Sequence, residues 1–488
     1  MSRRTAVFLA LLAALSLGIY VFASHLTYTV GLPLDDAWIH QTYARNLAQR
    51  GEWAFLPGQP SAGSTGPLWA VFLSLGYALQ LNPLFWTYLL GWLFLTGLGV
   101  LGVLLFRQLS PGVESWAPWA GVLLVLEWHL VWAAGSGMET LLFAFLIAAL
   151  MSLLLQVGKQ SQCSWHNGLI IGCLIGLTVW VRPGGVTLLA PAFFVVLFLQ
   201  GPWRGKLKTV TLVMLGFILL FGPYLFFNYS VGDAWWPNTF YAKQAEYASH
   251  RQIPLLQRWL DQAVLPLVGV GSILLPGFLF TLMKQIRHRN WAGVSAVLWA
   301  GGYLSMYAWR LPVTYQHGRY LIPMMPIFFL WGLAGLVEFL EFHTKTWYQR
   351  AMGKAGLVAA ALLLLIFFGL GAQAYGRDVA IIETEMVAVA HWIEENTPED
   401  ALIAAHDIGA LGYFADRSIL DLAGLVSPEV IPFLRDQARL EVYMVDQGAD
   451  YLVTFPSWYP DLVAGARPVF QIDTPVSLTV DHENMAVY

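Results

Sequence analysis

The stretch TVTLVMLGFILLFGPYLFFN, residues 209–228, carries no charged side chain and has the length of roughly 20 residues that a bilayer-spanning helix requires. Residues 292–309 and 356–371 form similar uncharged runs. Of the 488 residues, 57% are hydrophobic and only 11% are charged, whereas about a quarter are charged in an ordinary soluble domain. We therefore predict an α-helical polytopic membrane bundle.

The composition also argues against several classes of function. The net charge is only -4 and no basic stripe with interleaved aromatic residues is found, so we expect no nucleic-acid partner. The two cysteines, Cys163 and Cys173, lie in or beside a predicted span and are too few for a disulfide framework. Arg3 and Arg4 precede an apolar run, which we interpret as a retained first helix rather than a cleaved signal peptide.

Basic residues between the apolar runs predict the sidedness, because Lys and Arg in short loops accumulate on the cytoplasmic side. The three basic clusters are Arg204/Lys206/Lys208, Lys284/Arg287/Arg289 and Lys345/Arg350/Lys354. Placing them inside together with the amino terminus gives about eleven spans, a first outer loop of residues 27–66 and a carboxyl terminus outside. We interpret residues 67–81 as an interfacial or re-entrant helix, since a crossing there would invert everything downstream.

The composition changes near Tyr375, after which charged residues and prolines alternate with short apolar stretches. We predict a membrane domain over residues 1–375 and a small soluble extracytoplasmic α/β domain over residues 376–488. Its expected elements are a helix over residues 378–395 and strands over residues 402–405, 419–422 and 451–455. His406 and Asp421 are interpreted as parts of turn and packing features, with contact to a bound substrate as the less favoured alternative.

The first outer loop begins GLPLDDAW at residues 31–38, so two adjacent carboxylates, Asp35 and Asp36, follow the first span. Apolar residues then recur every four positions over residues 36–50, which predicts an amphipathic helix lying on the bilayer. One aspartate would suffice to cap this helix. A pair at the boundary between water and lipid also suits a general base or a cation ligand.

The same outer face is expected to carry further ionisable side chains at the ends of spans and in the second large loop: Glu139, Arg182, Lys243 and Arg319. Each has a structural explanation, such as a favourable helix end for a carboxylate or contact with lipid head groups for a cation. Arg319 is harder to explain in this way, because a cation at the amino end of a helix opposes the helix dipole and needs an anionic partner. A carboxylate facing several cations suits glycosyl transfer from a lipid phosphate, where the base accepts a proton and the cations neutralise the departing phosphate.

Several short motifs resemble those of one family. They are DDAWI (35–39), YARNL (43–47), GSTGPLW (63–69), GMET (137–140), PNTFYAK (237–243) and GRYLIP (318–323). Together they resemble the GT-C superfamily of polyprenyl-phosphate-sugar-dependent glycosyltransferases, which includes protein O-mannosyltransferases, the lipid A aminoarabinose transferase and mycobacterial arabinofuranosyltransferases. The resemblance implies an inverting transferase in the cytoplasmic (inner) membrane, whose active site faces outward. It would move a sugar from a polyprenyl-phosphate donor to a hydroxyl of a glycan, lipid or protein acceptor.

The resemblance also implies roles for the candidate residues. Asp35 would be the catalytic base, and Asp36 and Glu139 would orient the acceptor or a cation. The donor phosphate would be held by Lys243, Arg319 and Arg182. Glu139 stands alone where some relatives have an acidic pair, so metal dependence is left open, with no certain cofactor and a divalent cation as one option. The sequence TGPL at residues 65–68 differs from the KPPL of the aminoarabinose enzymes, which weakens a lipid A acceptor.

Two other classes of function fit parts of the sequence. A polytopic transporter or a flippase for lipid-linked sugars also combines apolar helices with a few ionisable groups, but such proteins place those groups near the midplane and often have repeated halves. Here the groups lie at predicted span ends and no twofold repeat is found. A non-catalytic scaffold would predict that neither Asp35 nor Asp36 matters.

Overall fold

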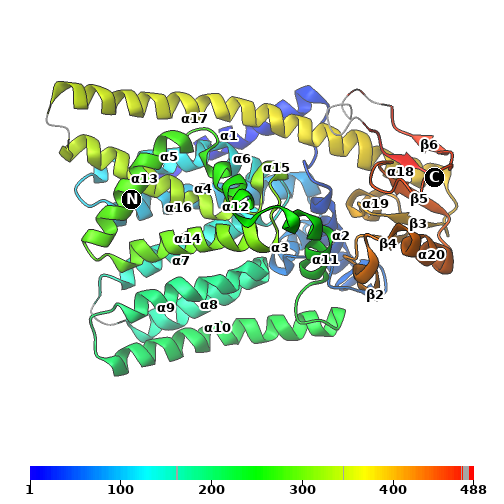
Figure 1. Ribbon diagram of the computed structural model, residues 1–488, viewed down its shortest axis with the longest axis horizontal. Helices are drawn as coiled ribbons and strands as arrows, with labels where there is room; N and C mark the ends of the chain where they lie inside the picture. The colour runs from blue at the N-terminus through cyan, green and yellow to red at the C-terminus, as the bar shows by residue number, and fades with distance from the viewer. Residues whose placement is uncertain (161–162, 344–345, 474, 476–482) are drawn as a thin grey trace.

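The computed structural model describes the whole chain except residues 161–162, 344–345, 474 and 476–482. Long helices run alongside one another, and the last hundred or so residues form a compact unit at one end of the bundle (Figure 1). The first ten helices are α1 (Arg3–Thr27), α2 (Asp35–Arg50), α3 (Pro67–Ala78), α4 (Pro83–Leu109), α5 (Ala117–Leu126), α6 (Trp128–Gly135), α7 (Thr140–Val157), α8 (Trp165–Val181), α9 (Leu189–Leu197) and α10 (Trp203–Gly232). The later helices are α11 (Asn238–Glu246), α12 (Leu255–Val264), α13 (Gly271–Arg287), α14 (Trp291–Arg310), α15 (Tyr315–Gly318), α16 (Met325–Glu338), α17 (Trp347–Ile382), α18 (Ala388–Asn396), α19 (Gly409–Phe414) and α20 (Gln437–Gln447).

The structure confirms that the chain is mostly helical and that several of its helices are apolar. Among the described residues, six helices are long and apolar enough to cross a bilayer, or up to eight if each of two bent pairs counts as one span. Three more apolar helices are shorter, and one of them is α3. With 12 residues, α3 is about 18 Å long, less than the roughly 30 Å of a hydrocarbon core. The expected number of about eleven spans stays a prediction.

Two pairs of helices approach closely because glycine leaves room for the neighbouring backbone. A Cβ atom on Gly172 of α8 would lie 2.0 Å from the carbonyl oxygen of Val213 on α10. A Cβ on Gly277 of α13 would lie 2.1 Å from the carbonyl oxygen of Gly332 on α16. Lipid supplies little drive for helices to associate, so close backbone packing of this kind stabilises the bundle.

The basic segments lie far from the C-terminal residues. Figure 1 places the amino terminus, the start of α10 and the start of α17 at the end of the bundle opposite the C-terminal unit. The first turns of α10 and α17 carry two of the predicted basic clusters, although Lys345 lies outside the described residues. The separation of the two ends fits the expected charge asymmetry, and the sidedness itself stays a prediction.

The C-terminal unit contains a five-stranded sheet with the order β4-β3-β5-β7-β6. Its strands are β3 (Leu402–Ala405), β4 (Ser418–Asp421), β5 (Tyr451–Thr454), β6 (Phe470–Gln471) and β7 (Ala486–Val487), and a separate two-stranded ribbon pairs β1 (Ala54–Leu56) with β2 (Gln59–Pro60). β3 pairs in parallel with β4 and β5, while β7 is antiparallel to β5 and β6. The three predicted strands are therefore confirmed, and the two-residue strands β6 and β7 were too short to predict. The predicted helix over residues 378–395 is not a separate element, because α17 continues to Ile382 and leads through a π-helical turn into α18.

The first outer loop contains the predicted helix, α2, but its expected place on the bilayer surface is wrong. On the face expected to meet water, His40 is as buried as the apolar Ile39. Of the other two residues expected there, Arg45 is partly buried and Gln49 is exposed. The helix packs against both α3 and α19, so protein covers most of it. The helical period therefore reflects a buried element rather than one lying on lipid.

Candidate active site

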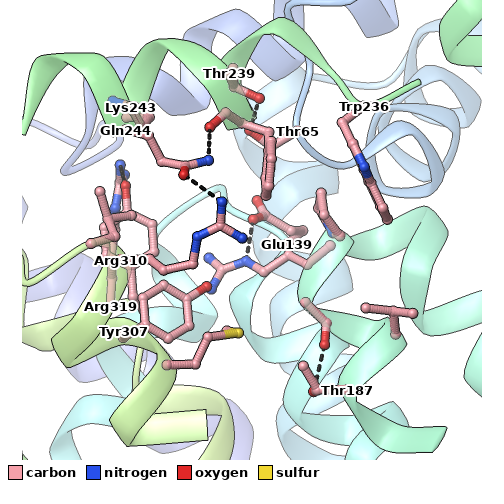
Figure 2. A pocket seen from close by; sticks show the side chains of 18 of the residues that line it. Thr65, Glu139, Thr187, Trp236, Thr239, Lys243, Gln244, Tyr307, Arg310 and Arg319 are labelled. Carbon is pink, nitrogen blue, oxygen red and sulfur yellow. Dashed lines mark hydrogen bonds and ion pairs between the residues drawn. The ribbon is translucent and has the colours of Figure 1, made fainter. Parts of the chain in front are cut away.

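A cavity of about 310 Å³ is lined in part by residues of α2 and α11, two helices that lie beside the C-terminal unit in Figure 1. Five of the six predicted site residues line it: Asp36, Glu139, Arg182, Lys243 and Arg319. The rest of the lining is mainly aromatic and apolar, and Figure 2 shows Trp236 and Tyr307 in these walls. The charged residues come from five separate regions of the chain, which the fold brings together around one space.

Asp36 is the carboxylate that faces the cavity cations. Its Oδ2 atom accepts a hydrogen bond of 2.5 Å from Nη2 of Arg319 and lies 3.8 Å from Nζ of Lys243. Burial alone would raise the pKa of Asp36, but Lys243 and Arg319 outweigh it and hold that pKa well below its usual range. Asp36 is therefore an ionised carboxylate between two cations, and Arg319 has the anionic partner that its position demanded.

Glu139 and Arg182 form the second ion pair of the cavity. Nε of Arg182 donates to Oε1 of Glu139 at 2.6 Å, and Nη2 donates to the hydroxyl of Thr140 at 2.9 Å. Nε2 of His40 lies 3.3 Å from the other oxygen of Glu139. As expected, Glu139 lies at the start of a helix, α7, and Arg182 lies at the end of α8. Both are almost fully buried, which excludes contact with lipid head groups as the explanation for Arg182.

Several donors at this cavity lack a partner within the described part of the chain. They are Nη1 of Arg182 and both Nε and Nη1 of Arg319. An unsatisfied buried donor costs about 1–3 kcal/mol, and more for a charged group. Arg310 joins the five predicted residues, so four cations and two carboxylates line the cavity and give it two net positive charges. The cavity is therefore suited to bind an anion.

Asp35, the expected base, does not line the cavity. Its Oδ2 atom accepts a hydrogen bond of 2.7 Å from the backbone N–H of Gly409, and Oδ1 accepts one of 2.8 Å from that of Ala410. Burial and the Asp407 carboxylate raise the pKa of Asp35 to about 8, against the opposing effect of these two donors. Neither aspartate caps α2 with its side chain, because Leu34 occupies the cap position. Instead Asp35 binds the first N–H groups of α19 in the C-terminal unit.

Other contacts fasten the same two elements together. The guanidinium of Arg45 donates to the carbonyl oxygens of Tyr413 and Gly412 at 2.8 and 3.2 Å. Trp38 packs on the ring of Tyr413 with a centroid distance of 4.8 Å. A Cβ on Gly409 would lie 2.0 Å from the carbonyl oxygen of Asp35, so only glycine fits there. The start of the first outer loop is thus joined to the C-terminal unit.

The backbone just before Arg319 adopts an uncommon conformation. Gln316, His317 and Gly318 all have positive φ, at 53°, 56° and 66°, and such consecutive non-glycine residues cost energy unless their surroundings hold them. Here Nε2 of His317 lies 2.7 Å from Oδ2 of Asp378 on α17, and its ring meets that of Trp132 edge-on. These contacts fix the turn that directs Arg319 toward Asp36.

Sequence reasoning missed two residues that contribute charge or polarity here. Arg310 ends α14 and donates to Oε1 of Gln244 at 2.7 Å, as Figure 2 shows. It lies at the end of an uncharged run, so the rule that identified Arg182 would also have found it. His40 lies four residues after Asp36 on α2, which is the spacing that places two side chains on one helix face.

Within the described residues, no group of three or more His, Cys, Asp or Glu side chains is placed to hold a metal ion. His129 is buried, and its Nδ1 atom lies 2.8 Å from Oε1 of Glu127.

The fold is shared with solved membrane enzymes. ArnT from Cupriavidus metallidurans bound to undecaprenyl phosphate is similar with a TM-score of 0.61 and 14% identity, over 98% of this chain and 97% of that one. The oligosaccharyltransferase of Archaeoglobus fulgidus is similar with a TM-score of 0.65 and 13% identity, over 93% of this chain and 69% of that one. The mycobacterial arabinofuranosyltransferase AftD, as mutant R1389S, has a TM-score of 0.52 and 15% identity, over all of this chain and 41% of that one.

The chain has the GT-C fold. It is a multi-pass membrane protein, as its apolar helices and its GT-C neighbours both indicate. At these levels of identity the likeness concerns the fold alone. Residues 377–488 match a family model described as a domain of unknown function (DUF8728). No curated protein sequence matches the chain.

Proposed function

We propose that this GT-C protein is an inverting glycosyltransferase that moves a sugar from a polyprenyl-phosphate donor to a hydroxyl of a glycan, lipid or protein acceptor. The reaction would take place on the outer face of the cytoplasmic membrane. The observation that carries the proposal is the cavity, whose lining combines two net positive charges with many aromatic and apolar side chains. A phosphate suits the charged residues, and an isoprenoid chain suits the apolar ones.

In the proposed reaction the acceptor oxygen attacks the anomeric carbon, and the bond between that carbon and the phosphate oxygen breaks. The hydroxyl proton passes to Asp36, and polyprenyl phosphate leaves. A single displacement inverts the configuration at the anomeric carbon. Arg319, Lys243 and Arg182 would neutralise the charge that develops on the leaving phosphate, which is a preorganised electrostatic contribution.

Asp36 replaces Asp35 as the proposed base because only Asp36 faces the cavity. In the free protein Arg319 and Lys243 weaken it as a base. A donor phosphate that takes contacts from both cations would raise the pKa of Asp36. The base would then gain strength when the donor is bound, and Glu139 would keep Arg182 in place.

The test is to incubate the purified protein with a radiolabelled polyprenyl-phosphate sugar and acceptor lipids or glycans, and to measure the release of polyprenyl phosphate. The proposal expects release by the wild type and by Asp35→Asn protein that remains folded, and none by Asp36→Asn. Loss in folded Asp35→Asn with retention in Asp36→Asn would restore the first assignment. Movement of intact donor across vesicles without release would instead indicate a translocase.

A further inference from the structure

The C-terminal unit holds α11, the helix that carries Lys243, at both of its ends. At the start of α11, Nδ2 of Asn238 donates to the carbonyl oxygen of Leu425 at 3.1 Å. At its end, the guanidinium of Arg435 donates to the carbonyl oxygen of Glu246. Ala245 also packs against the apolar core of the C-terminal unit. Lys243 lies between these attachments, so its position depends on a part of the chain outside the membrane helices.

The carboxylate of Glu246 connects Lys243 to His406, a side chain of the C-terminal unit. Oε2 of Glu246 lies 3.9 Å from Nζ of Lys243, and Oε1 lies 3.6 Å from Nε2 of His406. The other ring nitrogen of His406 lies 2.8 Å from the hydroxyl of Tyr459. Glu246 is therefore shared between a cation of the cavity and a histidine of the C-terminal unit.

The segment that carries His406 is fixed to the first outer loop. Three residues further on, the N–H group of Gly409 binds the carboxylate of Asp35 at 2.7 Å. The backbone contact at Gly409 allows no side chain, so this segment and α2 keep one relative position. Asp35 thereby places His406 beside Glu246.

We propose that the C-terminal unit sets the affinity of the cavity for the donor phosphate through His406, a positioning residue that draws Glu246 away from Lys243. The inference rests on the proposed function, because it treats Lys243 as a ligand of that phosphate. It also gives a role to the segment that matches a domain of unknown function.

The charges around His406 give the sign of the effect. Glu246, Asp407 and Asp421 favour its protonated form, and Lys243 disfavours it. Burial would lower the pKa of His406, but Glu246 and Asp407 outweigh burial and raise it above its ordinary value of about 6.5. When His406 is protonated it competes for Glu246, and Lys243 is free to bind phosphate. When His406 loses its proton, Glu246 pairs with Lys243 alone, so the affinity for the donor falls as pH rises.

The experiment measures KM for the polyprenyl-phosphate sugar and kcat between pH 6 and 9. The donor is a phosphodiester, whose single charge does not change in this range. In the wild type we expect KM to rise about threefold to fivefold with pH, the effect of one partly exposed ion pair, with kcat changing less. His406→Gln should show the high KM at every pH, and His406→Lys, with its permanent charge, the low KM at every pH.

Two further variants separate positioning from general damage. Glu246→Gln should give the low KM at all pH values and make a second change at His406 silent. His391→Gln removes a comparable pair, His391 with Glu394 at 3.4 Å on exposed α18, and should behave as the wild type. If wild-type KM is independent of pH, or if His406→Lys fails to keep KM low while Glu246→Gln is active, the inference is overturned.

Binding of undecaprenyl phosphate at one pH keeps the two proposals apart. A wild type that neither binds this lipid nor releases polyprenyl phosphate would overturn the proposed function. If the wild type does both, but substitutions at His406 and Glu246 leave the KM for the donor unchanged, only the role of the C-terminal unit is overturned.

Discussion

Asp35 and Asp36 occupy successive positions at the start of α2, where neighbouring side chains point about 100° apart around the helix axis. One carboxylate meets backbone N–H groups of the C-terminal unit, and the other meets Arg319 and Lys243 at the cavity. The first region has only neutral donors and the second has two cations. Identical side chains thus acquire an attachment role and a proposed chemical role from their direction alone.

The largest effect is expected from Asp36→Asn. Loss of a general base costs about a hundredfold to ten-thousandfold in rate, and the amide also leaves Arg319 without its anionic partner. The measurement is kcat for polyprenyl phosphate release by folded, purified protein. The matched control is Asp261→Asn, an exposed carboxylate on α12, which should leave kcat unchanged. An equal loss of kcat in Asp36→Asn and Asp261→Asn would show that Asp36 has no special role in the reaction.

Arg319→Ala should shift the pH dependence of the same group. Arg319 helps to hold the pKa of Asp36 low, so its removal raises that pKa and moves the acid limb of kcat/KM to higher pH. We also expect kcat/KM at its optimum to fall about tenfold to a hundredfold, because a charge-assisted contact to the phosphate is lost. A profile with the wild-type acid limb would show that Asp36 is not the titrating base.

Asp35→Asn should act mainly on stability. The amide can accept at only one of the two N–H groups it faces, which costs about 1–3 kcal/mol in the free energy of unfolding. Because the pKa of Asp35 is raised to about 8 in the folded state, its contribution is full below about pH 4 and is lost as pH rises toward 8. The midpoint temperature of thermal unfolding (Tm) in detergent should therefore fall more steeply with rising pH in the wild type than in the variant. The opposite slope would contradict the assigned environment.

The smallest effect is expected from Arg310→Gln. Arg310 lines the same cavity, but its guanidinium donates to Gln244 rather than to a carboxylate and lies 5.3 Å from the ring centre of Phe240. Its loss should raise the donor KM about threefold without moving the acid limb. A loss as large as that of Arg319→Ala would show that the contact with Asp36 is not what distinguishes the two arginines.

Much of the membrane region was predictable because its signals are local. Uncharged runs identified helices such as α10, and the expectation that Glu139 and Arg182 lie at helix ends was confirmed. The sequence predicted that these ionisable residues share one face of the membrane, but it did not predict that five of them line one cavity. The pairing of Arg182 with Glu139, rather than with a ligand alone, depends on how α7 and α8 pack, which no local pattern contains.

The assignment within the aspartate pair could not be predicted for the same reason. The direction of Asp35 depends on Gly409 and Ala410, which follow it by more than 370 residues. The amphipathic period of α2 was read as a helix on lipid because the cover provided by α19 is equally distant in sequence. His406 was interpreted as a packing residue, since the chain gives no sign that Glu246 lies beside it.

The contact between His406 and Glu246 also has a consequence for the newly made protein. Ribosomes add about 5–20 residues per second, and His406 follows Glu246 by 160 positions, so α11 exists for about 10–30 s before its partner is synthesised. During that interval Glu246 has Lys243 beside it but not yet His406. Under the proposed role of His406, a growing chain has an unfinished cavity with weak affinity for lipid phosphate. The protein then gains its full affinity for the donor lipid only after the last part of the polypeptide has folded.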